Sequence, residues 1–220
     1  MAFSAIIFDC DGVLVDSEVI YHEVEMEHLT RIGLEYEPVE YQRRFMGLNA
    51  DDFLAELDRD HRARKDAPLP ADFGTALRED SIARLRTELR IVDGIEAVIA
   101  GFVGPKAVAT SSAPDTLEIK LEVTGLKRHF EPHIYHAAQV ARGKPAPDLF
   151  LMAAQKLGAE PSGCLVIEDS VNGVKGGLAA GMTVWGFAGG GHADAGLAQR
   201  LREAGAHDVF FSHADLRASL

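Results

Sequence analysis

The sequence has few cysteines, a single tryptophan and no long apolar run. Its 2 cysteines, Cys10 and Cys164, each lie at the edge of an apolar segment expected to be a buried strand, so we expect no disulfide framework and a reducing compartment. Every apolar run is shorter than the roughly 18 residues that a membrane-spanning helix needs. The first apolar run is broken by Asp9 and has no basic stretch before it, which disfavours a secretory signal peptide. We therefore expect a cytoplasmic protein with no membrane partner.

Positive charge is also scarce. The 22 Lys and Arg residues are outnumbered by 34 Asp and Glu residues, which gives a formal net charge of −12. The densest basic stretches, at 59–65 and 84–86, lie among acidic residues and are typical of solvated helix faces. Because such a chain repels a nucleic-acid backbone, we expect no nucleic acid as a partner. The sequence also indicates no obligatory protein partner.

The alternation of two apolar patterns predicts the fold. Short β-branched or aromatic runs occur at residues 5–8, 106–110, 133–136, 164–168, 183–187 and 208–211. Helical spacing of apolar residues occurs between the later runs, at 115–124, 148–157, 171–180 and 195–204. Strands that alternate with helices build a parallel sheet covered on both faces. We therefore predict an α/β protein whose core is a Rossmann-like doubly wound parallel sheet.

Residues 16–91 follow a different pattern. They contain helical spacing but no convincing strand, and the helical stretches are 18–31, 51–62 and 72–89. We therefore expect 16–91 to be an inserted α-helical cap domain. Residues 1–15 and 92–220 would then form a discontinuous α/β catalytic core.

Polar side chains end or closely follow four of the predicted strands. They are Asp9, Asp11, Thr110, Ser111, Ser112, Lys144, Glu168 and Asp169. Ligands collect at the carboxyl ends of the strands in a doubly wound sheet. We therefore expect these side chains to converge on one crevice, although they are distant in the sequence.

Carboxylates from separate strand ends repel one another at close range. A divalent cation is the usual compensation, and oxygen ligands with open water positions suit Mg²⁺. The pair formed by Asp9 and Asp11 could by itself merely cap the next turn. Its expected acidic neighbours make a metal site the better interpretation.

Lys144 and Thr110 supply the expected contacts to an anion. Lys144 precedes Pro145, whose fixed φ angle makes the loop rigid, and its charge can neutralise carboxylates and bind a phosphoryl oxygen. The hydroxyl of Thr110 and the backbone N–H groups of Ser111 and Ser112 can hold an anion. A hydroxyl after a strand can also be a simple helix N-cap.

Together these groups are what phosphoryl transfer through an aspartyl-phosphate requires. Asp9, at the end of the strand, can attack phosphorus in line. Asp11 can protonate the leaving oxygen and later deprotonate water. The two carboxylates therefore have separate roles.

The sequence resembles the haloacid dehalogenase superfamily, in the phosphatase and phosphomutase branch whose helical cap is inserted after the first strand. Four motifs carry the resemblance in order: DCDGVLVDS (9–17), AVATSS (107–112), GKPAPDLF (143–150) and VIEDSVNGVKGGLAAGM (166–182). The resemblance implies that Asp9 is the nucleophile and Asp11 the general acid/base. It also implies that Thr110 binds phosphate and that Lys144 neutralises charge.

The resemblance further implies a Mg²⁺ site. Asp9, the backbone carbonyl of Asp11 and Asp169 would hold the ion, with Glu168 near or behind it. Dehalogenation of 2-haloacids is another reaction of the superfamily, but the members that perform it lack the second carboxylate and need no metal. The presence of Asp11, Glu168 and Asp169 therefore favours a phosphatase.

Two further reactions of the superfamily fit less well. Phosphonate hydrolysis depends on a cap lysine that forms a Schiff base, and the cap lysine here, Lys65, lies in a charged run typical of solvent exposure. β-Phosphoglucomutases carry a histidine twelve positions after the nucleophile, where this chain has Tyr21, with His22 one position later. They also carry a cap arginine where this chain has Ala50, which cannot hold the second phosphate of a bisphosphate.

We therefore predict a Mg²⁺-dependent phosphomonoester hydrolase that acts on a small phosphorylated metabolite, a sugar or sugar-acid phosphate. A β-phosphoglucomutase-like mutase and a non-catalytic module that binds phospho-ligands are the alternatives. Glu18 and Asn49 of the cap are candidates for substrate contact, although either can be an ordinary surface group. The glycine-rich loop at 187–192 follows the fifth strand and is expected near the crevice. It could contact substrate or simply turn the chain, and we favour the turn.

Overall fold

The computed structural model describes residues 3–45, 48 and 50–220. The chain divides into two compact units. We call Met1–Val19 together with Leu85–Leu220 the α/β unit, and Ile20–Arg84 the helical unit. That residues 16–91 form a separate cap domain stays a prediction.

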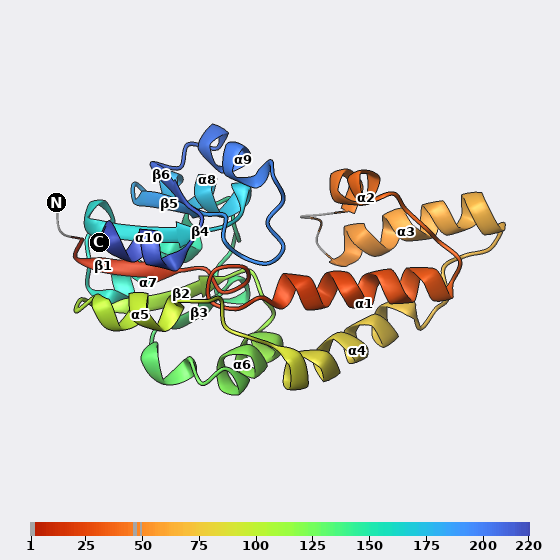
Figure 1. Ribbon diagram of the computed structural model, residues 1–220, viewed down its shortest axis with the longest axis horizontal. Coiled ribbons are helices and arrows are strands. Elements are labelled where there is room, and N and C mark those ends of the chain that lie inside the picture. Colours follow the sequence, from red (N-terminus) through yellow and green to blue (C-terminus); the bar gives the residue numbers. More distant parts are fainter. Residues whose placement is uncertain (1–2, 46–47, 49) are drawn as a thin grey trace. The chain divides into compact units, whose positions relative to one another are not determined.

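A parallel sheet of 6 strands runs through the α/β unit in the order β3-β2-β1-β4-β5-β6 (Figure 1). The strands are β1 (Ala5–Phe8), β2 (Lys106–Thr110), β3 (Ile134–His136), β4 (Cys164–Glu168), β5 (Thr183–Phe187) and β6 (Asp208–Phe210). Every pairing between neighbours is parallel. The order of the strands reverses between β1 and β4, which is where ligands bind in doubly wound sheets. The prediction of a doubly wound α/β core is confirmed.

Both faces of this sheet are buried, and β1 shows why its sequence is apolar throughout. Successive side chains of a strand point to opposite faces. Ala5 and Ile7 join an apolar cluster that also contains Leu149 of the helix after β3. The alternate residues, Ile6 and Phe8, are equally buried. An uninterrupted apolar run is what a strand covered on both faces requires.

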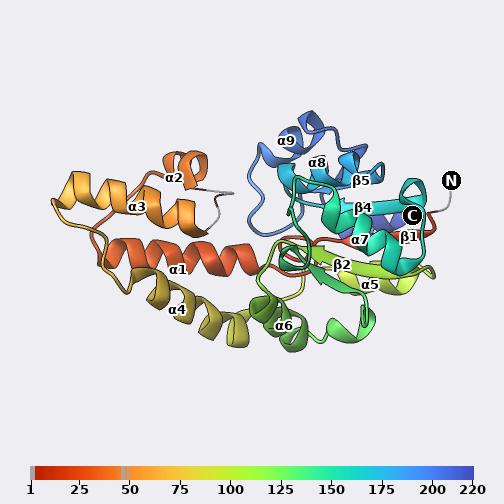
Figure 2. The same cartoon turned by 180° about the vertical axis from the view of Figure 1, so that it is seen from behind.

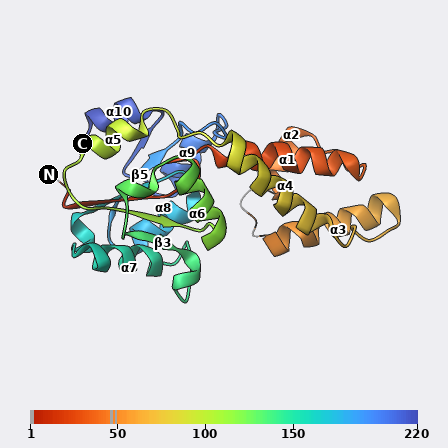
Figure 3. The same ribbon diagram turned by 90° about the horizontal axis from the view of Figure 1, so that it is seen from below.

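Helices cover the sheet on both sides. Those of the α/β unit are α5 (Ile95–Gly101), α6 (Pro114–Val123), α7 (Asp148–Leu157), α8 (Val171–Ala179), α9 (Leu197–Glu203) and α10 (His213–Ala218). Short 3-10 turns occur at Lys127–His129, Ala137–Gln139 and Pro161–Gly163. Figure 3 shows α5 and α10 on one face of the sheet and α7 on the other. Seen from behind, α8 and α9 lie beside β5 (Figure 2).

The sequence predicted α6 to α9 to within two residues at each end but did not predict α5 and α10. These two helices have only 7 and 6 residues, which is too short to show an apolar period. Gly158 ends α7 with a φ angle of 68°, as expected for a glycine after a helix. No helix in the described part of the chain is long and apolar enough to cross a membrane.

The helical unit contains α2 (Pro38–Phe45) and α3 (Ala50–Lys65), with most of α1 (Ser17–Arg31) and of α4 (Phe73–Glu88). No strand occurs among its described residues, as predicted. Its buried cluster consists of Leu29, Leu34, Tyr41, Phe45, Phe53, Leu57 and Phe73. The helix α2 was not predicted, because its 8 residues span little more than two turns.

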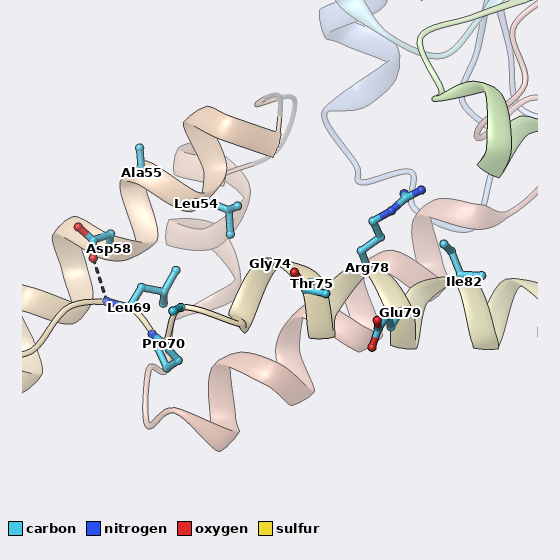
Figure 4. Close-up of a pocket in the computed structure, with 11 residues that line it drawn as sticks. Leu54, Ala55, Asp58, Leu69, Pro70, Gly74, Thr75, Arg78, Glu79 and Ile82 are labelled. Carbon is cyan, nitrogen blue, oxygen red and sulfur yellow. Dashed lines mark hydrogen bonds between the residues drawn. The ribbon is translucent and has the colours of Figure 1, made fainter.

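An open groove of about 820 Å³ lies between α3 and α4 within the helical unit (Figure 4). Apolar side chains such as Leu54 and Ile82 line it together with the oppositely charged Arg78 and Glu79. The backbone N–H of Leu69 closes one end by donating to the carboxylate of Asp58 at 2.8 Å. Because its lining mixes apolar groups with charges of both signs, the groove indicates no ligand class.

The buried imidazole of His213 couples the stability of the α/β unit to pH. Its ring stacks on Phe187 with 4.2 Å between centroids, and its Nδ1 donates to the backbone carbonyl of Asp93 at 3.0 Å. Burial lowers the pKa of His213 below its ordinary value of 6.5.

We expect the free energy of unfolding to fall as the pH falls below about 6.5. Below that pH the unfolded chain binds a proton on His213 that the folded chain does not yet bind. The variant His213→Asn removes the titrating ring and keeps an N–H donor for Asp93, so its stability should depend less on pH. Urea unfolding between about pH 5 and about pH 8 compares the two proteins. Parallel stability curves would contradict this expectation.

Candidate active site

The register of the sheet places Asp9 at the point where the strand order reverses. The backbone N–H of Asp9 donates to the carbonyl of Ile167 in β4 at 2.9 Å, which brings Asp9 beside Glu168. Gly12 follows with a φ angle of 71°, and a methyl group there would lie 1.9 Å from Oδ2 of Asp169. Glycine is therefore required for the loop after β1 to pass close to Asp169.

Lys144 joins the two strand ends. Its ammonium donates to Oδ1 of Asp9 and, at 2.6 Å, to Oε1 of Glu168. The side chains of Lys144 and Glu168 are 3% and 1% exposed, so this ion pair lies away from bulk water. Burial alone would lower the pKa of Lys144, but Asp9 and Glu168 raise it above its ordinary value, so the lysine stays charged.

A residue that follows β4 also holds the side chain of Glu168. Its Oε2 accepts hydrogen bonds from the backbone N–H and the hydroxyl of Ser170, both at 2.8 Å. Both of its oxygens are therefore engaged, one by Lys144 and one by Ser170. That Glu168 lies near or behind a metal stays a prediction.

The carboxylate of Asp9 is only partly compensated. Burial raises its pKa well above the ordinary value, and the charge of Lys144 opposes that rise. Glu168, Asp169 and Asp11 raise it further because each adds a nearby negative charge. A site with this excess of buried carboxylates favours one more cation.

The second carboxylate, Asp11, is held by three donors from separate segments. The hydroxyl of Ser17 and the ammonium of Lys120 donate to Oδ1, and the hydroxyl of Ser112 donates to Oδ2. Lys120 also donates to the hydroxyl of Ser112 at 2.9 Å. Burial alone would raise the pKa of Asp11, but Lys120 and the two hydroxyls bring it below its ordinary value. Asp11 is therefore an ordered, ionised group.

Lys120 was missed by the sequence analysis. It lies on α6 at 1% exposure, on the same buried face as Leu117 and Leu121. In the sequence it is flanked by Glu118 and Glu122, which makes it look like a solvated lysine. The available signal was its spacing of three residues from Leu117, which places it on the apolar face of the helix.

Thr110 occupies the end of β2 and is buried. Its hydroxyl oxygen accepts a hydrogen bond from the backbone N–H of Ser112 at 3.0 Å. Ser111 between them is exposed. The N–H of Ser112 thus points to Thr110 in this structure, and its expected use by an anion, together with the N–H of Ser111, stays a prediction.

Asp169 meets a histidine that the sequence analysis did not assign to the site. Nε2 of His192 lies 3.1 Å from Oδ2 of Asp169. Burial raises the pKa of Asp169 to about 6, His192 opposes this, and the charges of Glu168 and Asp11 add to it. The loop after β5, for which a simple turn was the favoured interpretation, therefore also contributes a side chain to the site.

The two candidate residues for substrate contact differ in what can be said of them. Glu18 lies in the α/β unit, where burial and the charges of Asp11 and Asp169 raise its pKa to about 7. It thus shares the electrostatic environment of the acidic cluster. Asn49 lies outside the described residues. Contact of either residue with a substrate stays a prediction.

A Mg²⁺ ion at this end of the sheet would have to be held by the carboxylates described above. Among the residues that the structure describes, no three His, Cys, Asp or Glu side chains are grouped to hold a metal ion. Lys120 donates to the carboxylate of Asp11, and Lys144 donates to that of Glu168. Mg²⁺ commonly takes one or two protein carboxylates and completes its shell with water and substrate phosphate. The side chains of Asp9 and Asp169 fit a site of that kind.

Residues 3–181 match the family model described as "haloacid dehalogenase-like hydrolase". The chain is 30% identical to fructose-1-phosphate phosphatase of Escherichia coli (strain K12), over 82% of this chain and 94% of that protein. It is 27% identical to 6-phosphogluconate phosphatase of the same organism, over 83% of this chain and 81% of that protein.

A solved structure shares the whole fold. It is a haloacid dehalogenase family hydrolase from Deinococcus radiodurans R1, with bound phosphate and sodium. The two chains are 40% identical, with a TM-score of 0.82 over 99% of this chain and 94% of that one. That protein therefore binds phosphate on the same fold.

Replacement of Lys120 by methionine would leave the carboxylate of Asp11 without its ion-pair partner. We expect the free energy of unfolding to fall by about 3 kcal/mol, as for other broken buried pairs. The double variant Asp11→Asn/Lys120→Met should lose less than the sum of the two single losses. Urea unfolding measures all three, with Lys175→Met on the exposed face of α8 as the control. Additive losses would show that the pair makes no net contribution.

Proposed function

The chain belongs to the haloacid dehalogenase-like hydrolase family, and we propose that it is a Mg²⁺-dependent phosphatase of small phosphorylated metabolites that works through an aspartyl-phosphate. One observation carries the proposal. The buried carboxylate of Asp9 lies at the switch point of the sheet and is held by Lys144, which is itself fixed by Glu168. A carboxylate that can act as the nucleophile and a permanent positive charge would then lie together where such sheets bind ligands, which supports the proposal.

In the first step, a carboxylate oxygen of Asp9 bonds to phosphorus while the bond from phosphorus to the leaving oxygen breaks. Asp11 gives its proton to that oxygen. In the second step, Asp11 takes a proton from water, whose oxygen bonds to phosphorus. The bond from phosphorus to Asp9 then breaks and releases inorganic phosphate.

The surroundings of Asp11 suit one of these steps better than the other. Lys120 stabilises the ionised carboxylate, which is the form that takes a proton from water. Donation to the leaving oxygen requires the protonated form, which the same lysine disfavours. We therefore expect a substrate with a poor leaving group to depend on Asp11 most in the first step, in which the leaving oxygen takes up a proton.

A Mg²⁺ ion would be held by the side chains of Asp9 and Asp169 and by the backbone carbonyl of Asp11. When bound there, the ion screens the repulsion between the nucleophile and the phosphate. Lys144 supplies the second positive charge on the phosphoryl side, and Thr110 supplies a hydroxyl. Glu168 keeps Lys144 in place.

The proposed substrates are sugar and sugar-acid phosphates. The support comes from the two Escherichia coli relatives, which are named for fructose 1-phosphate and 6-phosphogluconate. A cytoplasmic setting is part of the proposal, supported by the two free and buried cysteines, Cys10 and Cys164.

Phosphate release from fructose 1-phosphate, 6-phosphogluconate and glucose 1-phosphate tests this function. We expect release that a chelator abolishes and added Mg²⁺ restores. Asp9→Asn should lower kcat by about 10³-fold or more, as for other lost nucleophiles. Asp72→Asn, an exposed aspartate, is the control and should behave like the parent.

Three outcomes would contradict the proposal. Near-parental activity of Asp9→Asn would remove Asp9 as the nucleophile. Conversion of glucose 1-phosphate to glucose 6-phosphate without phosphate release would show a mutase. Absence of turnover with every phosphoester would favour a binding module.

The role of Asp11 is tested by the quality of the leaving group. We expect Asp11→Asn to lower kcat/KM for a sugar phosphate by about 10²- to 10⁴-fold, because the leaving oxygen must be protonated. The loss with p-nitrophenyl phosphate should be less than about tenfold, because that leaving group needs no proton. Equal losses for the two substrates would remove Asp11 as the proton donor.

A further inference from the structure

The loop between β5 and α9 packs closely against the backbone of neighbouring segments. A methyl group at Gly189 would lie 2.5 Å from the carbonyl oxygen of Phe211. At Gly190 it would lie 2.7 Å from the carbonyl oxygen of Gly12. The glycines therefore allow a close approach of two backbones, which is more than a turn requires.

Two contacts fix the end of this loop. The backbone N–H of Gly191 donates to Oδ1 of Asp16 at 2.8 Å. A methyl group at Gly191 would lie 2.8 Å from Cγ2 of Val19, so this residue is also closely packed. The loop is thereby held where the next residue, His192, reaches the acidic cluster.

The imidazole of His192 packs between two segments that carry proposed metal ligands. Its Nε2 lies 3.1 Å from Oδ2 of Asp169, and its side chain is 12% exposed. Its Cε1 would lie 2.5 Å from a methyl group at Gly12, the neighbour of Asp11. The ring therefore touches the loop that holds the carbonyl of Asp11 and the carboxylate of Asp169 at once.

The hydrogen bonding of this ring is directed at Asp169 alone. Nδ1 of His192 is buried and has no hydrogen-bond partner among the residues that the structure describes. Because Nε2 engages Oδ2 of Asp169, the other oxygen, Oδ1, is the one that can face a cation.

We propose that His192 is a positioning residue that holds the Asp169 carboxylate in its metal-binding orientation and so sets the affinity of the site for Mg²⁺. The inference rests on the proposed function, which assigns the ion to this site. Ligating carboxylates are commonly held by hydrogen bonds from residues outside the metal's own shell, and loss of such a partner costs about 10- to 100-fold in affinity. If the Asp169 carboxylate were mobile before binding, ordering it would cost conformational entropy and would weaken the affinity for the ion.

Calorimetric titration of the full-length protein with Mg²⁺ alone tests the inference. We expect His192→Leu to raise the Kd for Mg²⁺ by about 10- to 100-fold. His192→Gln, which keeps an N–H donor at the position of Nε2, should stay closer to the parent. His129→Leu, an exposed histidine of the same unit, is the matched control and should bind Mg²⁺ like the parent.

A kinetic readout separates positioning from a loss of structure. The Mg²⁺ concentration for half-maximal activity of His192→Leu should rise by the same factor as its Kd. At saturating Mg²⁺ its kcat should return to within a few-fold of the parent, and thermal unfolding should show a folded protein. A purely structural role would lower kcat at every Mg²⁺ concentration.

Three results would overturn the inference. If the parent and His192→Leu bind Mg²⁺ equally, His192 does not set the affinity, although the proposed function stands. If His192→Gln is as weak as His192→Leu, the hydrogen bond to Asp169 is not the cause. If the parent neither binds Mg²⁺ nor needs it for turnover, the metal part of the proposed function fails as well.

Discussion

The burial of like charges at the ends of two neighbouring strands is the constraint on which this structure depends. The register between β1 and β4 brings Asp9 beside Glu168, and the turn at Gly12 brings Asp169 against the same loop. Ionised carboxylates taken out of water and set close together destabilise the fold unless cations compensate them. The fold supplies two buried lysines, Lys144 and Lys120, for this purpose.

The two lysines divide the acidic cluster into groups with different chemistry. Lys144 bridges Asp9 and Glu168, whereas Lys120 pairs with Asp11 together with two hydroxyls. The pKa of Asp9 nevertheless stays raised while that of Asp11 is lowered. Under the proposed mechanism, the incomplete compensation of Asp9 favours a further cation there, and the ionised Asp11 would be the form that accepts a proton.

Much of the fold could be predicted because local patterns of apolar residues in the sequence determine its strands and longer helices. Strands such as Ala5–Phe8 are buried on both faces and read as continuous apolar runs. Helices of the length of Asp148–Leu157 show their period in sequence. The same reasoning could not find Pro38–Phe45 or His213–Ala218, which are too short to reveal a period. Element ends also differ by one to three residues, since the last turns depend on tertiary contacts.

The site was predictable where it follows strand ends and unpredictable where it depends on tertiary packing. Asp9 and Asp169 come directly after apolar runs or at their ends, so topology alone brings them together. Lys120 lies on a helix near two glutamates, and although its spacing from Leu117 indicates the apolar face, its pairing with Asp11 depends on tertiary packing. His192 follows three glycines that look like a flexible turn. Its contact with Asp169 depends on how closely those glycines pack against other segments. No local sequence pattern predicts that packing.

The most direct test of the account is to look for a phosphoryl group on the protein during turnover. The enzyme would be mixed with a sugar phosphate, quenched in acid, digested and examined by mass spectrometry. The account predicts a phosphorylated peptide that contains residues 9–12, with the modification on Asp9 and none in the Asp9→Asn variant. Turnover without any phosphorylated carboxylate, or with the phosphoryl group on another residue, would contradict it.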